Sequence, residues 1–419
     1  MNKTLLKKYA KLIVTMGSNL EKGQGVIINC PVEQHEFAKL VAKEAYAQGA
    51  GWVRIDWGCQ EFTKMKYKSE SVKTLSKVET WEEEKMKFSA EALPAMIHIA
   101  SADPDGLKGV DPVKIQKSNI ARMKVLKPYR DMMDDKYQWT IVAVPCEKWA
   151  KKVFPEEKRT SKAIEMLWEA ILMSVRVTKD NDPVKEWQEH NAKLQAKYRK
   201  LNDMNFDYLH YTNKKGTDFK CWLIDGGKWN GGGDYTQKGT FFNPNMPTEE
   251  VFTSPLAGKA EGVVYSTKPL SYSGQLIDEF FVRFENGAAV EWGAEKGKEA
   301  LDMMMGMDEG AKKLGELALI PYHSPISDSG ILFYNTLFDE NASCHVALGR
   351  GFASTLENSA ELSKEEQKAA GINDSLIHVD FMIGSEDMNI DGYTRDGKMV
   401  PVFRNGDWAI YFIKGRQSI

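Results

Sequence analysis

The chain has few cysteines, and their distribution excludes two classes of protein. Of its 419 residues only five are cysteines, namely Cys30, Cys59, Cys146, Cys221 and Cys344, and none belongs to a C-x-x-C pair. A disulfide-stapled miniprotein needs a dense and even set of cysteines, and a cysteine zinc site needs closely spaced pairs. The scattered, odd number therefore argues against both and predicts a reducing, cytoplasmic location.

Long apolar runs and a large charge of one sign are also missing. No stretch approaches the roughly 20 apolar residues that a membrane helix needs. The first eight residues already contain three lysines, so they hold no signal-peptide core. Lys and Arg number 56 against 59 Asp and Glu, a net charge of -3, which gives no electrostatic reason to expect nucleic acid. We therefore expect a globular protein that binds neither membranes nor nucleic acids.

Several catalytic and cofactor-binding motifs are absent. The chain has no P-loop, no G-x-S-x-G nucleophile turn and no H-E-x-x-H zinc helix. Its Gly23-Gln24-Gly25 sequence precedes a predicted strand, whereas a dinucleotide-binding turn follows one. The N-terminal half is therefore predicted to be a scaffold that supports the substrate domain.

Residues 1–204 are predicted to form an α/β layer domain with a parallel sheet, because helical and strand periodicities alternate along them. The predicted strands are short apolar runs separated by helical segments, and they span residues 26–30, 52–57, 96–100 and 140–144. The predicted helices span about residues 5–16, 33–48, 161–175 and 183–201.

Residues 205–419 have a different pattern, with alternating strands and glycine-rich turns. The predicted strands lie near residues 217–223, 259–266, 279–284, 288–292, 379–383 and 408–413. We expect a mixed, mainly antiparallel β domain with a few helices. The predicted fold class is thus α/β followed by a C-terminal α+β domain.

Two segments of this second half contain histidine together with acids. His378 and Asp380 are two apart in a predicted strand, so both side chains project from one face and can hold a divalent ion. A structural hydrogen bond between them is the alternative. Asp339, Glu340 and His345 surround a small-residue turn in an apolar context, where the alternative is a surface turn that caps the next element.

Two further segments contain buried-looking acids. Glu316 begins an apolar run, where an acid is costly unless a positive group meets it. A salt bridge to Lys312 or Lys313 is the alternative to a metal. Glu249 and Glu250 lie in a proline-bounded stretch, and the alternative there is a helix start with Thr248 as its N-cap.

In this order, the four segments resemble a known family. The strings Pro-Thr-Glu-Glu-Val-Phe-Thr-Ser-Pro, Gly-Glu-Leu-Ala-Leu-Ile-Pro, Asp-Glu-Asn-Ala-Ser-Cys-His and His-Val-Asp-Phe-Met-Ile-Gly are similar to those of the aminopeptidase T, AmpS and PepS metallopeptidases, family M29. The resemblance extends over essentially the whole chain. It places the ligands of a dinuclear metal centre on Glu250, Glu316, Glu340, His345, His378 and Asp380. Four carboxylates and two imidazoles suit two divalent ions such as Zn, Co or Mn.

The resemblance also implies roles for individual residues. Glu316 and Asp380 are candidates to bridge the two ions, and Glu316 is the candidate to pass a proton from water to the leaving amine. Relatives of the aminopeptidase T type have a tyrosine seven residues after the histidine of the third string, where this chain has Phe352. A phenyl ring cannot donate a hydrogen bond. Either that hydroxyl is dispensable, or another donor replaces it, with Arg350, Tyr322 and His323 as candidates.

The function predicted from this resemblance is removal of N-terminal residues from short peptides by a cytoplasmic, metal-dependent aminopeptidase. The resemblance also implies a homodimer whose active sites face an internal cavity. Two alternatives remain from the residues alone. One is a non-catalytic peptide- or metabolite-binding protein, and the other is a metallo-amidase or deacylase that acts on other small amides.

Overall fold

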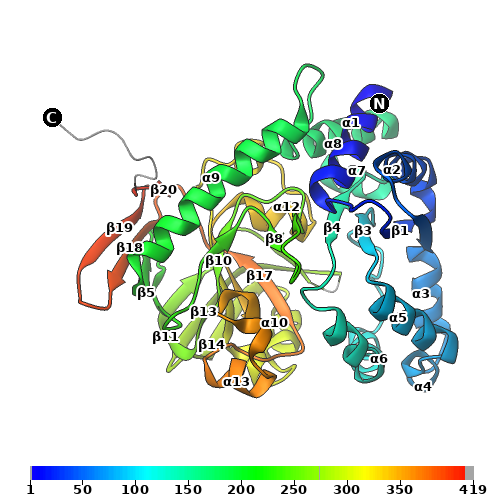
Figure 1. Ribbon diagram of the computed structural model, residues 1–419. Helices are drawn as coiled ribbons and strands as arrows, with labels where there is room; N and C mark the ends of the chain where they lie inside the picture. Colours follow the sequence, from blue (N-terminus) through cyan, green and yellow to red (C-terminus); the bar gives the residue numbers. More distant parts are fainter. Residues whose placement is uncertain (1, 273, 411–419) are drawn as a thin grey trace. The chain divides into compact units, whose positions relative to one another are not determined.

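The structure, a computed structural model, describes residues 2–272 and 274–410 and divides into two compact units (Figure 1). The first unit contains the chain up to Glu189 together with residues 233–247, and the second contains residues 190–232 and 248 onward. The predicted domain boundary after residue 204 stays a prediction. Among the described helices, none combines the length and the apolar character needed to cross a membrane.

A four-stranded parallel sheet forms the centre of the first unit, as predicted. Its strands follow the order β2-β1-β3-β4, and every neighbouring pair is parallel. The apolar runs form strands because both faces of such a sheet are covered by helices. The four strands are β1 (Gly25–Pro31), β2 (Trp52–Gly58), β3 (Ala95–Ala100) and β4 (Trp139–Ala143).

Helices separate these strands in sequence and surround the sheet in Figure 1. Helix α2 (His35–Gln48) ends where Gly49 adopts φ 101°, a left-handed conformation that favours glycine. A short hairpin, β8 (Asp234–Tyr235) with β9 (Phe241–Phe242), completes the unit, and α9 continues into the second unit. The helices are α1 (Lys3–Leu12), η1 (Ile13–Gly17), η2 (Val32–Gln34), α2 (His35–Gln48), α3 (Gln60–Ser69), α4 (Val72–Ser76), α5 (Thr80–Ala92), α6 (Pro112–Met133), α7 (Glu147–Val153), α8 (Thr160–Ser174) and α9 (Pro183–Met204).

The second unit contains two antiparallel sheets, which confirms the predicted mainly antiparallel β architecture. The five-stranded sheet has the order β17-β16-β15-β10-β7. Its strands are β7 (Asn230–Gly231), β10 (Val251–Thr253), β15 (Leu314–Leu319), β16 (His345–Gly349) and β17 (His378–Met382).

The larger sheet has the order β12-β13-β11-β6-β5-β18-β19-β20, with β14 also paired to β13. Of the predicted strand at residues 408–413, only residue 408 is in a strand, β20. Residues 409 and 410 are not in a strand, so the prediction is wrong there, and residues 411–413 lie outside the described part of the chain. The strands are β5 (Phe206–Thr212), β6 (Asp218–Leu223), β11 (Pro255–Tyr265), β12 (Leu270–Tyr272), β13 (Gln275–Glu285), β14 (Ala288–Lys296), β18 (Asn389–Thr394), β19 (Met399–Arg404) and β20 (Asp407–Trp408).

Short helices connect the strands of this unit. They are α10 (Lys298–Met305), η3 (Gly310–Lys312), α11 (Pro325–Asp328), α12 (Thr336–Asp339), η4 (Glu340–Ala342), η5 (Ala353–Thr355), η6 (Ser359–Glu361) and α13 (Lys364–Ala369).

The two sheets of the second unit share one apolar core. Leu317 of β15, Val346 of β16 and Phe381 of β17 belong to the same buried cluster as Phe280 of β13. The rings of Phe280 and Phe381 lie 5.2 Å apart. Because side chains alternate along a strand, the residues between these core positions project from the opposite face of the five-stranded sheet.

Candidate metal centre

The opposite face of the five-stranded sheet contains most of the predicted metal ligands. Glu316 of β15 and Asp380 of β17 both lie directly across from Ala347 on the strand between them. Only a methyl group therefore separates the two carboxylates at the level of the sheet. His345 lies two residues before Ala347, and His378 two residues before Asp380, so both imidazoles project from this same face.

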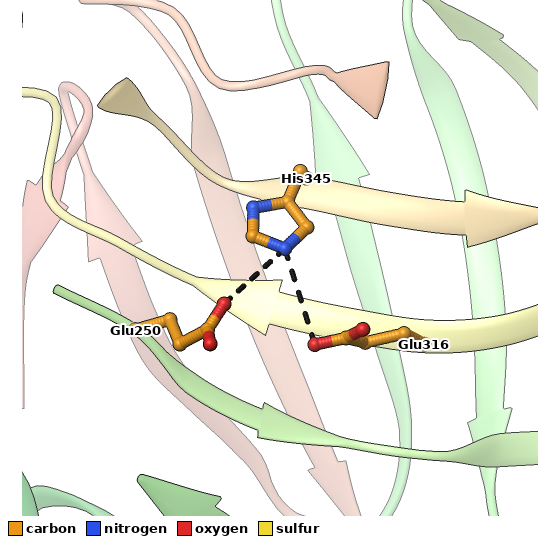
Figure 2. A group of neighbouring side chains, drawn as sticks. All are labelled: Glu250, Glu316 and His345. Carbon is orange, nitrogen blue, oxygen red and sulfur yellow. Dashed lines mark ion pairs between the residues drawn. The ribbon is translucent and has the colours of Figure 1, made fainter. Parts of the chain in front are cut away.

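Acids surround the Nε2 atom of His345 (Figure 2). This nitrogen lies 3.4 Å from Oε2 of Glu250, 3.9 Å from Oε1 of Glu316 and 3.9 Å from Oδ1 of Asp380. Figure 2 shows the side chains of Glu250 and Glu316 converging on the imidazole from two different strand regions. Glu250 reaches it because its residue immediately precedes β10.

The second histidine, His378, contacts two of these acids, Glu316 and Asp380. Nε2 of His378 lies 3.1 Å from Oε2 of Glu316 and 3.3 Å from Oδ1 of Asp380. Glu316 thus directs one carboxylate oxygen toward each imidazole, whereas a single oxygen of Asp380 lies between the two rings. A carboxylate split in this way has the arrangement of a bridging ligand.

Backbone carbonyls fix the orientation of both imidazoles. Nδ1 of His345 lies 2.9 Å from the carbonyl oxygen of Glu340, and Nδ1 of His378 lies 2.7 Å from that of Arg350. A carbonyl can only accept, so each Nδ1 donates its hydrogen, and each Nε2 faces the acids, where it can bind a metal only after losing its own proton. The sequence contained no signal for these contacts, because the accepting groups belong to the main chain.

The cluster is buried and rich in negative charge. Burial raises the pKa of Glu316 to about 7, with Asp380 and Glu250 adding to the effect and a hydrogen bond from His378 opposing it. Burial and the same neighbouring acids raise the pKa of Glu340 well above its usual value. Burial alone would lower the pKa of His345, but Glu250 and the other carboxylates raise it to about 10. The directions agree with a crowd of buried carboxylates, which disfavours further negative charge and favours positive charge beside it.

The donor set suits divalent ions. Oδ1 of Asp380 is buried and makes no hydrogen bond of good geometry among the described residues, although Nε2 of His378 lies 3.3 Å away and Nε2 of His345 lies 3.9 Å away. Two groups could each hold an ion, because their ligand atoms lie within 4.8 Å of one another: Glu250, Glu316 and His345 in one, and Glu316, His378 and Asp380 in the other. The groups share Glu316. Carboxylate and imidazole ligands are those that Zn, Co and Mn accept.

Glu340, on the short helix η4, belongs to neither of these two groups but lies close to their acids. It is buried, and its charge interacts with Asp380, Glu250 and His345. The alternative of an exposed capping turn is wrong here, because residues 337–349 are all buried. The neighbouring Asp339 has a different environment, since its two oxygens accept the backbone N–H groups of Phe333 and Asn335 at 2.8 and 2.9 Å.

The local alternatives for the other two acids also fail. Residues 248–250 are not helical and lead directly into β10, so Thr248 caps no helix. Its carbonyl oxygen instead lies 2.7 Å from Nε2 of the buried His190. Glu316 meets the two histidines rather than Lys312 or Lys313.

The three candidate oxyanion donors and Phe352 lie in different settings. Arg350 is exposed directly after β16, and its contact with His378 is made by its backbone carbonyl. Tyr322 packs its ring against His323, whose Nδ1 pairs with Asp328 at 3.0 Å on the surface. Phe352 lies with its ring centroid 4.7 Å from that of His378. The predicted catalytic role of the Arg350 side chain stays a prediction.

Comparisons with known proteins agree over nearly the whole chain. The profile of the family described as "Thermophilic metalloprotease (M29)" matches residues 2–408. Aminopeptidase 2 of Geobacillus stearothermophilus is 44% identical, covering 96% of this chain and 97% of the relative. Aminopeptidase AmpS of Bacillus subtilis is 45% identical, covering 96% and 98%. The solved structure of wild-type AmpT from Thermus thermophilus superimposes with a TM-score of 0.89 at 38% identity, covering 97% of this chain and 100% of that one. The chain therefore belongs to the M29 family of metalloproteases, as its four sequence strings predicted.

Proposed function

We propose that this protein is an aminopeptidase that removes N-terminal residues from short peptides with a dinuclear metal centre. The placement of Glu316 is the observation that carries the proposal, because one of its oxygens faces His345 and the other faces His378. The relatives that match along the full chain are named aminopeptidases, which supports the choice of an N-terminal substrate. The proposed homodimer and cytoplasmic location rest on the resemblance and on the cysteine pattern.

The proposed ligands divide into two sets that share one acid. Glu250 and His345 would hold one ion, His378 and Asp380 the other, and Glu316 would contact both. Glu340 would add the fourth carboxylate, so that four negative charges balance two dications. Divalent cations supply the Lewis acidity that activates water and polarises a carbonyl group.

The chain's own residues would then bind and move protons. The Glu316 carboxylate lies between both imidazoles, so we assign it to take a proton from water and to give it to the leaving nitrogen. The backbone carbonyls of Glu340 and Arg350 would keep the two imidazoles in one tautomer throughout the reaction. Arg350 is the proposed donor to the oxyanion, in place of the hydroxyl that Phe352 lacks.

Metal removal and an amine block test this function together. Hydrolysis of leucine p-nitroanilide is expected to stop in EDTA and to return when Zn or Co is added. The reason is that the bound cations supply the Lewis acidity that activates water. The same substrate with an acetylated α-amine is expected to stay intact under all conditions. Cleavage of the acetylated substrate would identify a general deacylase, and the absence of turnover with every metal would favour a binding protein.

Adjacent acids in one segment give a second test of the ligand set. Asp339→Asn is expected to lower the free energy of unfolding by about 1–2 kcal/mol, since the amide can accept only one of the two backbone N–H groups. Glu340→Gln is expected to lower metal content instead. Denaturant unfolding and elemental analysis of both variants measure the two effects. Equal metal content in the two variants would remove Glu340 from the proposed site.

A further inference from the structure

The metal cluster is unevenly exposed, and its open end lies at one residue. The side chain of His345 is 1% exposed and that of Glu316 is 5% exposed. Asp380 is 10% exposed and Glu250 11%, whereas His378 reaches 21%. Among these five side chains, solvent therefore touches the cluster mainly at the His378 imidazole. A substrate entering the cluster should pass this ring.

An aromatic pair stands beside that ring. The centroid of Phe352 lies 4.7 Å from that of His378, and Phe252 meets Phe352 edge to face at 5.6 Å. Phe252 lies across from Ala318 in the five-stranded sheet, and Ala318 is two residues from Glu316 on the same strand. By strand alternation, Phe252 projects from the face that holds the ligands.

Hydrogen bonds hold this pair in place. The hydroxyl oxygen of Ser254 accepts the backbone N–H of Phe352 at 2.8 Å and donates to its carbonyl at 3.3 Å. Ser254 is buried and lies two residues after Phe252, so one side chain ties the Phe352 backbone to the segment that carries Phe252. Both phenyl rings are nevertheless only half-buried, unlike the core phenylalanines of this unit. The pair thus offers a fixed apolar surface at the open end of the cluster.

We infer that Phe352 and Phe252 form the wall that receives the first side chain of the substrate. This inference rests on the proposed aminopeptidase function. It assigns the substrate class as peptides with a large apolar first residue, such as leucine or phenylalanine. The physical reason is burial, because a leucine-sized side chain covers the apolar surface of the rings, whereas alanine leaves most of the wall in contact with water. The two residues are specificity determinants and supply no reacting group.

The ratio of two substrates tests the wall. We expect Phe352→Ala and Phe252→Ala each to lower the kcat/KM ratio of leucine to alanine p-nitroanilide by roughly tenfold. The metal content should remain that of the unaltered protein. Phe352→Tyr keeps the ring and is expected to keep the ratio. If an alanine variant does not fold, Phe352→Leu replaces it, with a lowered ratio of phenylalanine to alanine p-nitroanilide as the expected result.

A matched control separates the wall from general packing. Phe281 is also a half-buried phenylalanine on a strand of the same unit, and its ring lies 5.7 Å from that of Tyr265. Phe281→Ala should lower stability and leave the substrate ratio unchanged. An unchanged ratio in both Phe352→Ala and Phe252→Ala would overturn the inference. Failure of the proposed function would look different, since the unaltered protein would then cleave neither substrate.

Discussion

Replacing Glu316 with glutamine is expected to lower kcat/KM for leucine p-nitroanilide by roughly 10³-fold. Metal content should fall for both ions, because Glu316 is the one residue shared by the two candidate ligand groups. Its oxygens lie 3.9 Å from Nε2 of His345 and 3.1 Å from Nε2 of His378. A glutamine side chain has nearly the same shape as glutamate. It lacks the negative charge that balances a cation, and its NH₂ group replaces one of the two ligand oxygens.

The thermal stability of the metal-free Glu316→Gln variant is a second measurement, and we expect it not to fall although activity does. In metal-free protein the crowded acids repel, and burial raises the pKa of Glu316 to about 7. Its ionised form is therefore unfavourable in the folded state, and removing the charge should leave the metal-free Tm equal or higher. A residue needed only for folding would lower activity and Tm together. Elemental analysis and calorimetry of the metal-free and metal-loaded variant measure both effects.

An exposed acid serves as the control for Glu316. Glu357 pairs with Lys228 at 3.2 Å, and its side chain is 67% exposed. Glu357→Gln should retain metal content, activity and Tm, since an exposed ion pair contributes less than about 1 kcal/mol. If Glu316→Gln behaved like Glu357→Gln, the bridging position would have no role in catalysis.

The sheet register explains why a sequence can indicate this site. Side chains two residues apart on a strand lie on the same face, so the spacing of His378 and Asp380 predicted that both project from one face. The structure places both residues in β17 and confirms this prediction. Joining Glu316 to Asp380 across Ala347 required the order of three strands, which periodicity alone does not give. The family strings supplied this missing long-range information.

Local rules failed where long-range pairing decided the conformation. Thr248 and the two acids after it have the composition of a helix start, yet β10 pairs with both β15 and β7 and keeps this segment extended. The imidazole orientation was equally invisible, because the acceptors for His345 and His378 are backbone carbonyls that any residue could supply. The ordered strings thus predicted which residues gather, and the structure shows how they are held.

Of the two adjacent acids of this segment, only Glu250 is expected to affect activity and metal content when it is replaced. Glu250→Gln is expected to lower kcat/KM by about 10²-fold or more and to reduce metal content, because its Oε2 lies 3.4 Å from Nε2 of His345. Glu249→Gln should retain both. Its carboxylate points instead toward His190, with 3.8 Å between Oε2 and Nε2, and its backbone N–H donates to Asn341 at 2.7 Å.

This pair is a stringent comparison because the environments match closely. Both side chains are about one-tenth exposed, both face a histidine, and one peptide bond separates them. General effects of removing a buried charge from this segment should therefore appear in both variants as similar changes in Tm. Only the loss of a metal ligand should appear in one. Equal loss of metal in Glu249→Gln and Glu250→Gln would mean that the segment acts through its conformation, and Glu250 would no longer count as a ligand.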